Sequence, residues 1–180
     1  MSKPDIETVS SRTAYGNKWM RVSEDVIRRR DGGEGIYAVV EKPSFVVVAP
    51  WHEGQLHLVE QYRYPVKSRQ WEFPQGAWDD PNAPWLDVAR GELEEETGQR
   101  AGSIVEVGEI FPLYGTASQS YRLFLATELT AGPQRLEDSE QDLITRAFPL
   151  AEVERMILDG TIRDGVTIAS FGLLRLKGLL

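Results

Sequence analysis

Hydrophobic and polar residues along the first third of the chain follow patterns typical of β-strands. Residues 15–30 mix β-forming and polar side chains, and the sequence DGGEG that follows is a strong turn signal before a second apolar stretch at 36–42. Residues 44–50 and 55–64 are richer in β-branched and other apolar side chains, and the short sequence WHEG connects them. The pattern predicts a strand, a turn and a strand near the N-terminus, followed by two core strands of a mixed sheet.

A helix is predicted between Pro84 and Gly98. Four apolar residues of this segment recur at the spacing of one helical face: Trp85, Val88, Ala89 and Leu93. Proline suits the first turn of a helix, and glycine readily adopts the left-handed conformation that ends one. The preceding sequence, WEFPQGAWDDPNAP, is predicted to be a loop.

The second half of the chain contains further strands and two helices. Apolar stretches at 103–111, 121–129 and 143–150 predict strands, whereas 151–160 and 164–180 have the spacing of amphipathic helices. The fold class is therefore α/β, or more strictly α+β, with a mixed sheet of about seven strands sandwiched between helices. The N-terminal strands are expected to form a small antiparallel extension of their own.

Composition and charge narrow the classes of function. The length of 180 residues suits one domain with at most a small appendage, and the net charge of -8 disfavours binding to DNA or to an anionic membrane surface. The first residues do not resemble a secretory signal, and no apolar stretch is long enough to cross a bilayer, so a cytoplasmic location and no membrane partner are expected. Because the chain has no cysteine, a bound metal would need oxygen or histidine ligands, which favours magnesium or manganese over zinc.

The predicted helix carries four glutamates within five positions. Residues three and four apart share a helical face, so Glu92, Glu95 and Glu96 point the same way while Glu94 is rotated aside. Three carboxylates on one face repel each other, and a hard divalent cation would neutralise them. A solvated acidic face of a surface helix is the alternative explanation.

Residues 76–98, GAWDDPNAPWLDVARGELEEETG, resemble the signature sequence of the Nudix hydrolases, the Nudix box. Three further segments resemble the ADP-ribose pyrophosphatase branch of that family: LVEQYRYPVKSRQWEFPQG, YGTASQSYRLFLAT and GTIRDGVTIASFGLL. The resemblance implies the Nudix fold over residues 41–180. It also implies that residues 1–40 form a β-strand extension through which the chain forms a homodimer.

The same resemblance implies the site residues. Glu92, Glu95 and Glu96 would bind Mg²⁺, or alternatively Mn²⁺, together with a main-chain carbonyl near Gly76. Arg63, in the sequence EQYRYP, would meet the phosphates of the substrate, as a guanidinium does well through paired hydrogen bonds. A surface salt bridge is the alternative for Arg63.

Other residues are assigned less uniquely by the resemblance. Glu72 would contact metal or substrate, or act structurally, and Trp78 would stack on a base or pack at a subunit interface. The general base would come from the loop QRLEDSEQDL, where Glu140 is the first choice and Glu137 the second. That loop could equally be an ordinary solvated loop, in which case Glu95 could serve as the base.

The box departs from the family signature in two places. Gly76 and Gly98 are one position further apart than the signature allows, and Gly91 stands where the family has an arginine. Arg90 lies one position early, which rotates its side chain by about 100° around the helix. Ala83 or Asn82, depending on the direction of counting, replaces the glutamate that is thought to pair with that arginine. Both members of this arginine–glutamate pair, which is thought to brace the loop against the helix, are therefore missing. The glutamates that the resemblance assigns to the metal are intact.

The resemblance implies an enzyme that hydrolyses the pyrophosphate bond of a nucleoside diphosphate sugar. ADP-ribose is the leading candidate, and the products would be a nucleoside monophosphate and a sugar phosphate. One alternative is a hydrolase of dinucleoside polyphosphates or capped RNA, since WEFPQG also resembles the box entry of those branches. The other alternative is a non-catalytic sensor of nucleotide sugars on the same fold.

Overall fold

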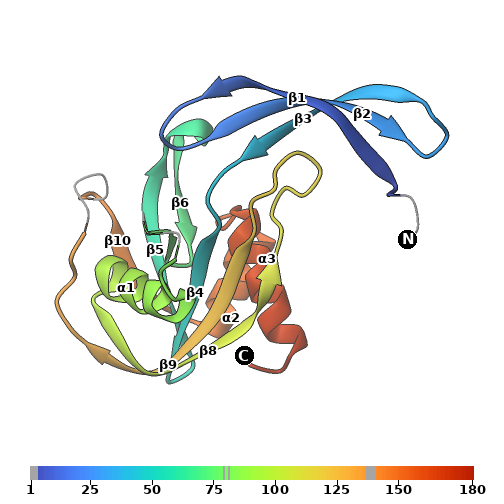
Figure 1. The fold of residues 1–180 in the computed structure, drawn as a ribbon. Helices are drawn as coiled ribbons and strands as arrows, with labels where there is room; N and C mark the ends of the chain where they lie inside the picture. Colours follow the sequence, from blue (N-terminus) through green and yellow to red (C-terminus); the bar gives the residue numbers. More distant parts are fainter. Residues whose placement is uncertain (1–3, 79, 81, 137–140) are drawn as a thin grey trace. The chain divides into compact units, whose positions relative to one another are not determined.

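A computed structural model of the chain describes residues 4–78, 80, 82–136 and 141–180. The chain divides into two compact units, which are drawn as one ribbon in Figure 1. The first unit consists of Met1–Ser44 and Phe111–Ser120, and the second of Phe45–Ile110 and Tyr121–Leu180. The glutamate helix lies entirely in the second unit.

The first unit contains a three-stranded antiparallel sheet in the order β1-β2-β3, with β1 at Ile6–Gly16, β2 at Arg21–Arg29 and β3 at Glu34–Glu41. The prediction of one strand over 15–30 was wrong at its start. A turn separates β1 from β2, in which Asn17 donates its N–H to the Met20 carbonyl at 3.0 Å. Every residue of β1 is exposed and most are polar, so hydrophobic alternation does not mark this strand.

The turn predicted at DGGEG is confirmed between β2 and β3. Gly33 donates its N–H to Asp31 Oδ1 at 2.8 Å, and Gly32 has a φ of 87°, which favours glycine. This geometry returns the chain antiparallel to β2.

The second unit is built on a seven-stranded mixed sheet, as the sequence predicts. The strand path is β10-β5-β4-β9-β8, with β6 paired to β5 and β7 paired to β4. β4 and β9 are parallel, and the other pairs are antiparallel. The strands span Phe45–His52 (β4), Gln55–Arg63 (β5), Ser68–Glu72 (β6), Gln75–Gly76 (β7), Gln99–Ile110 (β8), Tyr121–Ala131 (β9) and Ile144–Pro149 (β10).

Helices cover both faces of this sheet. Figure 1 shows α1 on one face and α2 and α3 on the other. The helices span Trp85–Thr97 (α1), Leu150–Leu158 (α2) and Gly165–Leu176 (α3), and a short 3-10 helix, η1, spans Tyr64–Val66. α1 ends at Gly98 in the left-handed conformation, as predicted. None of the helices in the described part of the chain combines the length and apolarity needed to span a membrane.

The alternation of side chains along the central strand β4 divides the core into two layers. Val46 and Val48 pack with the apolar stripe of α1, whereas Val47 and Ala49 pack with residues of α2 and α3. The α1 layer contains Val46, Val48, Val88, Ala89, Leu93, Phe124, Ala126 and Leu129. α1 is therefore held against the sheet by its apolar stripe, and Glu92 and Glu96 are buried on the same side of the helix.

A buried hydroxyl connects α3 to the chain just before β7. Asp164 caps α3 by accepting the N–H of Thr167 at 2.8 Å, and its Oδ2 also accepts the Thr167 hydroxyl at 2.7 Å. Thr167 Oγ1 in turn accepts the N–H of Phe73 at 2.9 Å. Phe73 precedes the PQG sequence that enters the glutamate helix, so α3 fixes the start of that loop.

Thr167→Val should show how much this connection contributes to stability. The change keeps the shape of the side chain but leaves the Phe73 N–H and one Asp164 oxygen without the hydroxyl, so we expect a loss of about 1–3 kcal/mol in the free energy of unfolding. Thr167→Ser retains the hydroxyl and is the matched control. Chemical denaturation of both variants measures the difference, and equal stabilities for Val and Ser would contradict the role of the hydroxyl.

Candidate active site

The acidic face of α1 is partly buried within the second unit. Glu96 is only 1% exposed and Glu92 is also buried, whereas Glu95 is partly exposed. Glu94 instead forms an ion pair with Arg100, with Nε and Oε2 3.3 Å apart. The four glutamates thus differ in environment, and Glu94 is set apart from Glu92 and Glu96, consistent with the predicted helical faces.

The two-residue strand β7 meets these buried carboxylates directly. Gln75 donates its N–H to Glu96 Oε2 at 3.1 Å. A Cβ atom at Gly76 would lie only 2.5–2.6 Å from three atoms of the Glu92 carboxyl group, so any side chain at this position would displace Glu92. Gly76 and Glu92, both named by the resemblance as metal ligands, therefore lie in direct contact. Sequence reasoning did not single out Gln75, whose only local signal is its place directly before Gly76.

Glu72 and Arg63 form a second charged group beside β7. Arg63 Nη2 lies 2.7 Å from Glu72 Oε1, and Arg63 Nε donates to Glu72 Oε2 at 3.2 Å. The Gln75 side-chain amide donates to the same Oε2 at 3.0 Å. The structure thus brings together two residues that the sequence suggested separately, and Gln75 connects them to Glu96.

Burial dominates the acid–base chemistry of Glu72. The side chain is 2% exposed, and its loss of hydration raises the pKa to about 7 from an ordinary value of 4.5, although the charge and hydrogen bond of Arg63 act in the opposite direction. The nearby carboxylate of Asp164 contributes to the raised pKa of Glu72 as a smaller cause than burial. A glutamate at this place can therefore change its protonation state near neutral pH.

The donor set near α1 suits a hard divalent cation. All the candidate ligands are oxygens: the carboxylates of Glu92, Glu95 and Glu96 and the main-chain carbonyl at Gly76. Within the described ranges, no three acidic or histidine side chains converge into a preassembled metal site. The metal ligands therefore remain a prediction, supported by the type of donor and by the contact of Gly76 with Glu92.

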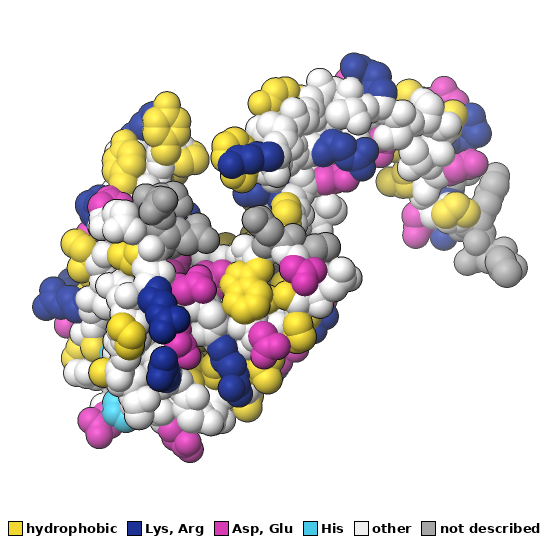
Figure 2. All heavy atoms as spheres, turned by 60° about the vertical axis from the view of Figure 1, so that its left-hand side comes forward, with side chains coloured by type: hydrophobic (Ala, Val, Ile, Leu, Met, Phe, Trp, Pro, Cys, Tyr) yellow, Lys and Arg dark blue, Asp and Glu magenta, His cyan; other side chains and the backbone are white. Residues whose placement is uncertain are grey.

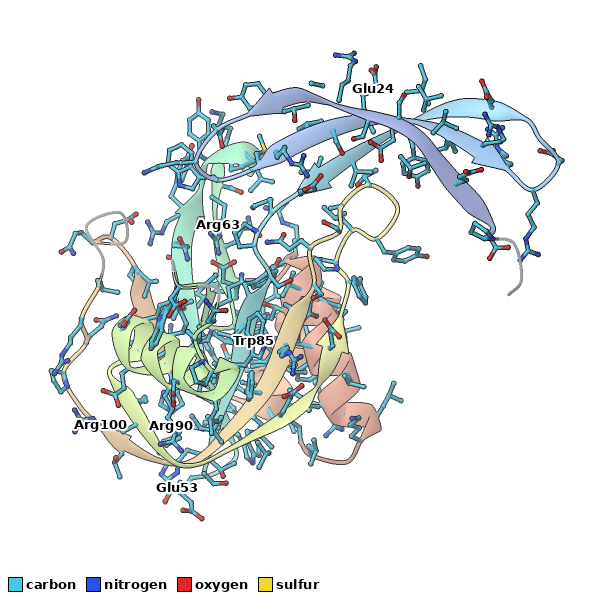
Figure 3. The ribbon with its side chains drawn as sticks, in the orientation of Figure 1. Glu24, Glu53, Arg63, Trp85, Arg90 and Arg100 are labelled. Atoms are coloured by element: carbon cyan, nitrogen blue, oxygen red, sulfur yellow. The ribbon has the colours of Figure 1, made fainter. Side chains whose placement is uncertain are left out.

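The structure shows the surroundings of Gly91 and Arg90, the two helix positions at which the box departs from the family signature. Trp78 packs against Gly91, so closely that a Cβ atom at Gly91 would overlap the indole ring. Arg90 is exposed, and Figure 3 shows Arg90 and Arg63 on different sides of α1. Arg90 therefore does not take the place of the family arginine.

The predicted general base, Glu140, and its alternative, Glu137, lie outside the described residues. The chain leading toward them is attached to the end of α1, since Gln134 donates its side-chain amide to the Glu96 carbonyl at 2.5 Å and Arg135 donates its N–H to the Glu95 carbonyl at 3.1 Å. After them, Asp142 pairs with Arg69 at 2.7 Å. Glu95, the alternative base, is partly exposed on α1.

The face of the second unit that carries α1 presents acidic side chains beside basic and hydrophobic ones (Figure 2). This mixture suits a ligand that combines phosphates, a bound cation and an apolar ring.

The raised pKa of Glu72 predicts a pH dependence of stability. Between pH 4.5 and about 7 the folded state holds a proton that the unfolded state has released, so the free energy of unfolding decreases as the pH rises through this window. Glu72→Gln removes this titration, and its stability relative to the unsubstituted protein should increase by roughly 2–4 kcal/mol between pH 4.5 and pH 8.

Denaturation in EDTA at several pH values measures this difference. Glu106→Gln is the control, because Glu106 pairs with Arg122 on the surface at 3.1 Å, and exposed pairs contribute little to stability. Parallel pH profiles for Glu72→Gln and the unsubstituted protein would contradict the buried titration.

Comparison with known proteins identifies the family. The family model for the nucleoside diphosphate sugar hydrolase N-terminal domain matches residues 6–40, and the model for the NUDIX domain matches residues 41–171. An ADP-ribose pyrophosphatase of Mycobacterium tuberculosis is 32% identical over 171 residues, which cover 94% of this chain and 83% of that protein. An ADP-ribose pyrophosphatase of Bacillus subtilis is 24% identical over 182 residues, which cover 100% of this chain and 98% of that protein.

A solved structure has the same fold. The crystal structure of an ADP compounds hydrolase superposes with a TM-score of 0.86 at 20% sequence identity and covers 99% of this chain and 98% of that one. The Nudix-domain match spans most of the chain, including β7, the glutamate helix and the strands that support them. The chain therefore belongs to the Nudix family of hydrolases.

Proposed function

We propose that the protein hydrolyses the pyrophosphate bond of a nucleoside diphosphate sugar, with ADP-ribose as the leading substrate. The products would be a nucleoside monophosphate and a sugar phosphate. The observation that carries this proposal is the 32% identity to an ADP-ribose pyrophosphatase over 94% of the chain. The match to a nucleoside diphosphate sugar hydrolase N-terminal domain at residues 6–40 supports the same substrate class.

The residues of α1 and β7 would hold the metal that this chemistry needs. Glu92, Glu95, Glu96 and the carbonyl at Gly76 are the proposed ligands, and Mg²⁺ is the first choice, with Mn²⁺ as an alternative. A bound cation of this kind neutralises charge on a diphosphate and lowers the pKa of a coordinated water. Glu140 is the proposed general base, with Glu95 as the alternative, and either would orient the attacking water and accept its proton.

Arg63 is the proposed phosphate-binding residue. Its guanidinium is oriented by Glu72 through Nε and Nη2. Because a guanidinium carries five N–H donors in a planar fork, one carboxylate cannot use them all, and the remaining donors can bind phosphate oxygens. Glu72 is thus proposed to position Arg63. For Trp78, contact with the substrate is the alternative to the positioning role that is proposed for it below.

The substrate proposal is tested by measuring hydrolysis, with Mg²⁺ or Mn²⁺, of ADP-ribose, GDP-mannose, other nucleoside diphosphate sugars, dinucleoside polyphosphates and capped RNA. We expect the highest kcat/KM for ADP-ribose, with AMP and ribose phosphate as products, and no activity in EDTA. A preference for dinucleoside polyphosphates or capped RNA would favour that branch of the family instead. Tight ADP-ribose binding without turnover of any compound would indicate a sensor.

Two glutamate variants in the same assay test the metal ligands. Glu96→Gln should lower kcat more than about 100-fold, because a direct ligand should matter at least as much as the residues that support ligands. Its amide oxygen can still accept the Gln75 N–H, so the fold should persist. Glu94→Gln is the control, because Glu94 lies two positions from Glu96 but pairs with Arg100. Its kcat should stay within twofold of that of the unsubstituted enzyme. Near-normal turnover by Glu96→Gln would contradict the proposed ligand set.

We also propose that residues 1–40 form a dimerisation extension and that residues 41–180 form the Nudix domain. The strands of the first unit and the turn between β1 and β2 expose large apolar side chains that a monomer would leave in water: Ile6, Val9, Tyr15, Trp19, Ile36 and Tyr37. A second copy of the chain would bury them, because a symmetric interface uses the same patch on both subunits.

The mass of the protein in solution, measured by light scattering, tests this arrangement. We expect a dimer that Ile36→Lys weakens, since Ile36 is 70% exposed on β3. Leu158→Lys changes an apolar residue that is 87% exposed on α2, and it should leave the dimer intact. A monomeric unsubstituted protein would rule the proposal out.

A further inference from the structure

Gly91 lies in the middle of α1, where glycine is among the least favourable residues for a helix. The space above it is filled by the side chain of Trp78. A Cβ atom at Gly91 would overlap Trp78 Cζ2 and would lie 3.0 Å from Cε2 and 3.2 Å from Nε1 of the same ring. No alanine or larger residue fits at position 91 unless the indole moves.

The contact joins the two segments that carry the proposed metal ligands. Trp78 follows Gly76 by two residues, and Gly91 directly precedes Glu92. The same two segments touch again where the Glu92 carboxyl group lies against Gly76. The segment after β6 therefore contacts the helix at two points: Gly76 against Glu92, and Trp78 against Gly91.

We propose that Trp78, seated on Gly91, braces the loop after β7 against α1 and thereby positions the carbonyl at Gly76 relative to Glu92. Trp78 and Gly91 are positioning residues in this account, and the effect on turnover rests on the proposed function. The contact of the Trp78 ring with the helix backbone at Gly91 takes the place of the arginine–glutamate pair that this sequence lacks. Arg90, which is exposed, takes no part in it.

Two features of Trp78 support this role over that of a surface side chain that does not hold the loop. The side chain is 40% exposed, so more than half of its surface is covered although it lies in a loop. A flat, rigid indole can lie against a helix at glycine without the loss of side-chain entropy that a longer flexible residue would incur. The fit is also specific, because only glycine leaves room for the ring.

A double-mutant cycle of Gly91→Ala, Trp78→Ala and the combination tests the packing by thermal unfolding. Helix propensity alone predicts that Gly91→Ala raises Tm by about 2–4 °C in a protein of this size. The proposed brace predicts that Gly91→Ala lowers Tm or fails to raise it when Trp78 is present. In the Trp78→Ala background the same change should raise Tm by the full amount, because the clash is gone.

Gly172 provides the matched control for the helix effect. It lies within α3, is partly buried like Gly91, and a Cβ atom there would meet no other atom within 4 Å. Gly172→Ala should therefore raise Tm in both backgrounds. An equal rise from Gly91→Ala in both backgrounds would overturn the brace, and this readout stands even if no substrate is turned over.

Kinetics separate positioning from direct substrate binding. If Trp78 positions the loop, Gly91→Ala and Trp78→Ala should both lower kcat about 10-fold or more and raise the Mg²⁺ concentration needed for half-maximal activity, with little change in KM for the nucleotide sugar. Trp78→Phe should recover part of the loss. If Trp78→Ala instead raises KM alone and Gly91→Ala leaves the kinetics unchanged, the indole contacts substrate and the positioning role is wrong.

Discussion

The site depends on one short strand that is held from two sides. Gln75 and Gly76 of β7 pair with Val47 and Val46 of β4, and on their other side they meet Glu96 and Glu92 of α1. β4 is the central strand of the sheet, and its side chains are buried in both core layers. The position of the loop relative to the carboxylates is therefore set by the buried central strand of the second unit.

The cost of this arrangement is the burial of negative charge. Glu72, Glu92 and Glu96 are all buried, and withdrawing carboxylates from water opposes folding. Arg63 offsets part of this cost for Glu72, but the pKa of Glu72 is still raised to about 7. A cation bound at the proposed ligands would stabilise the folded state, because ligands that bind only the folded protein raise its stability.

Gly91 illustrates how a local rule is broken and compensated elsewhere. Taken alone, a glycine in the interior of a helix weakens it, and the neighbouring Arg90 points to solvent. In the folded chain the missing side chain makes room for Trp78. Such departures from local preference concentrate at functional sites, where tertiary contacts supply the reason.

The sequence by itself determined the elements that depend on neighbouring residues. Apolar stretches identified β4, β5 and β9, and the 3.6-residue period of α1 separated Glu92 and Glu96 from Glu94. Pro84 and Gly98 marked the ends of that helix. β1 was not recognised as a strand in its own right, because its exposed polar residues carry no alternation and its pairing with β2 holds it in place.

Only the tertiary structure decided how these elements meet. Phe73 and Thr167 are hydrogen-bonded although they are 94 positions apart. The hydrogen bonds that Arg63 and Gln75 donate to Glu72 follow from the alignment of β5, β6 and β7. The fit of Trp78 on Gly91 likewise needs the loop and the helix in place. Local patterns constrain the backbone over a few residues, whereas these contacts depend on how the sheet and helices pack, which no pattern of neighbouring residues specifies.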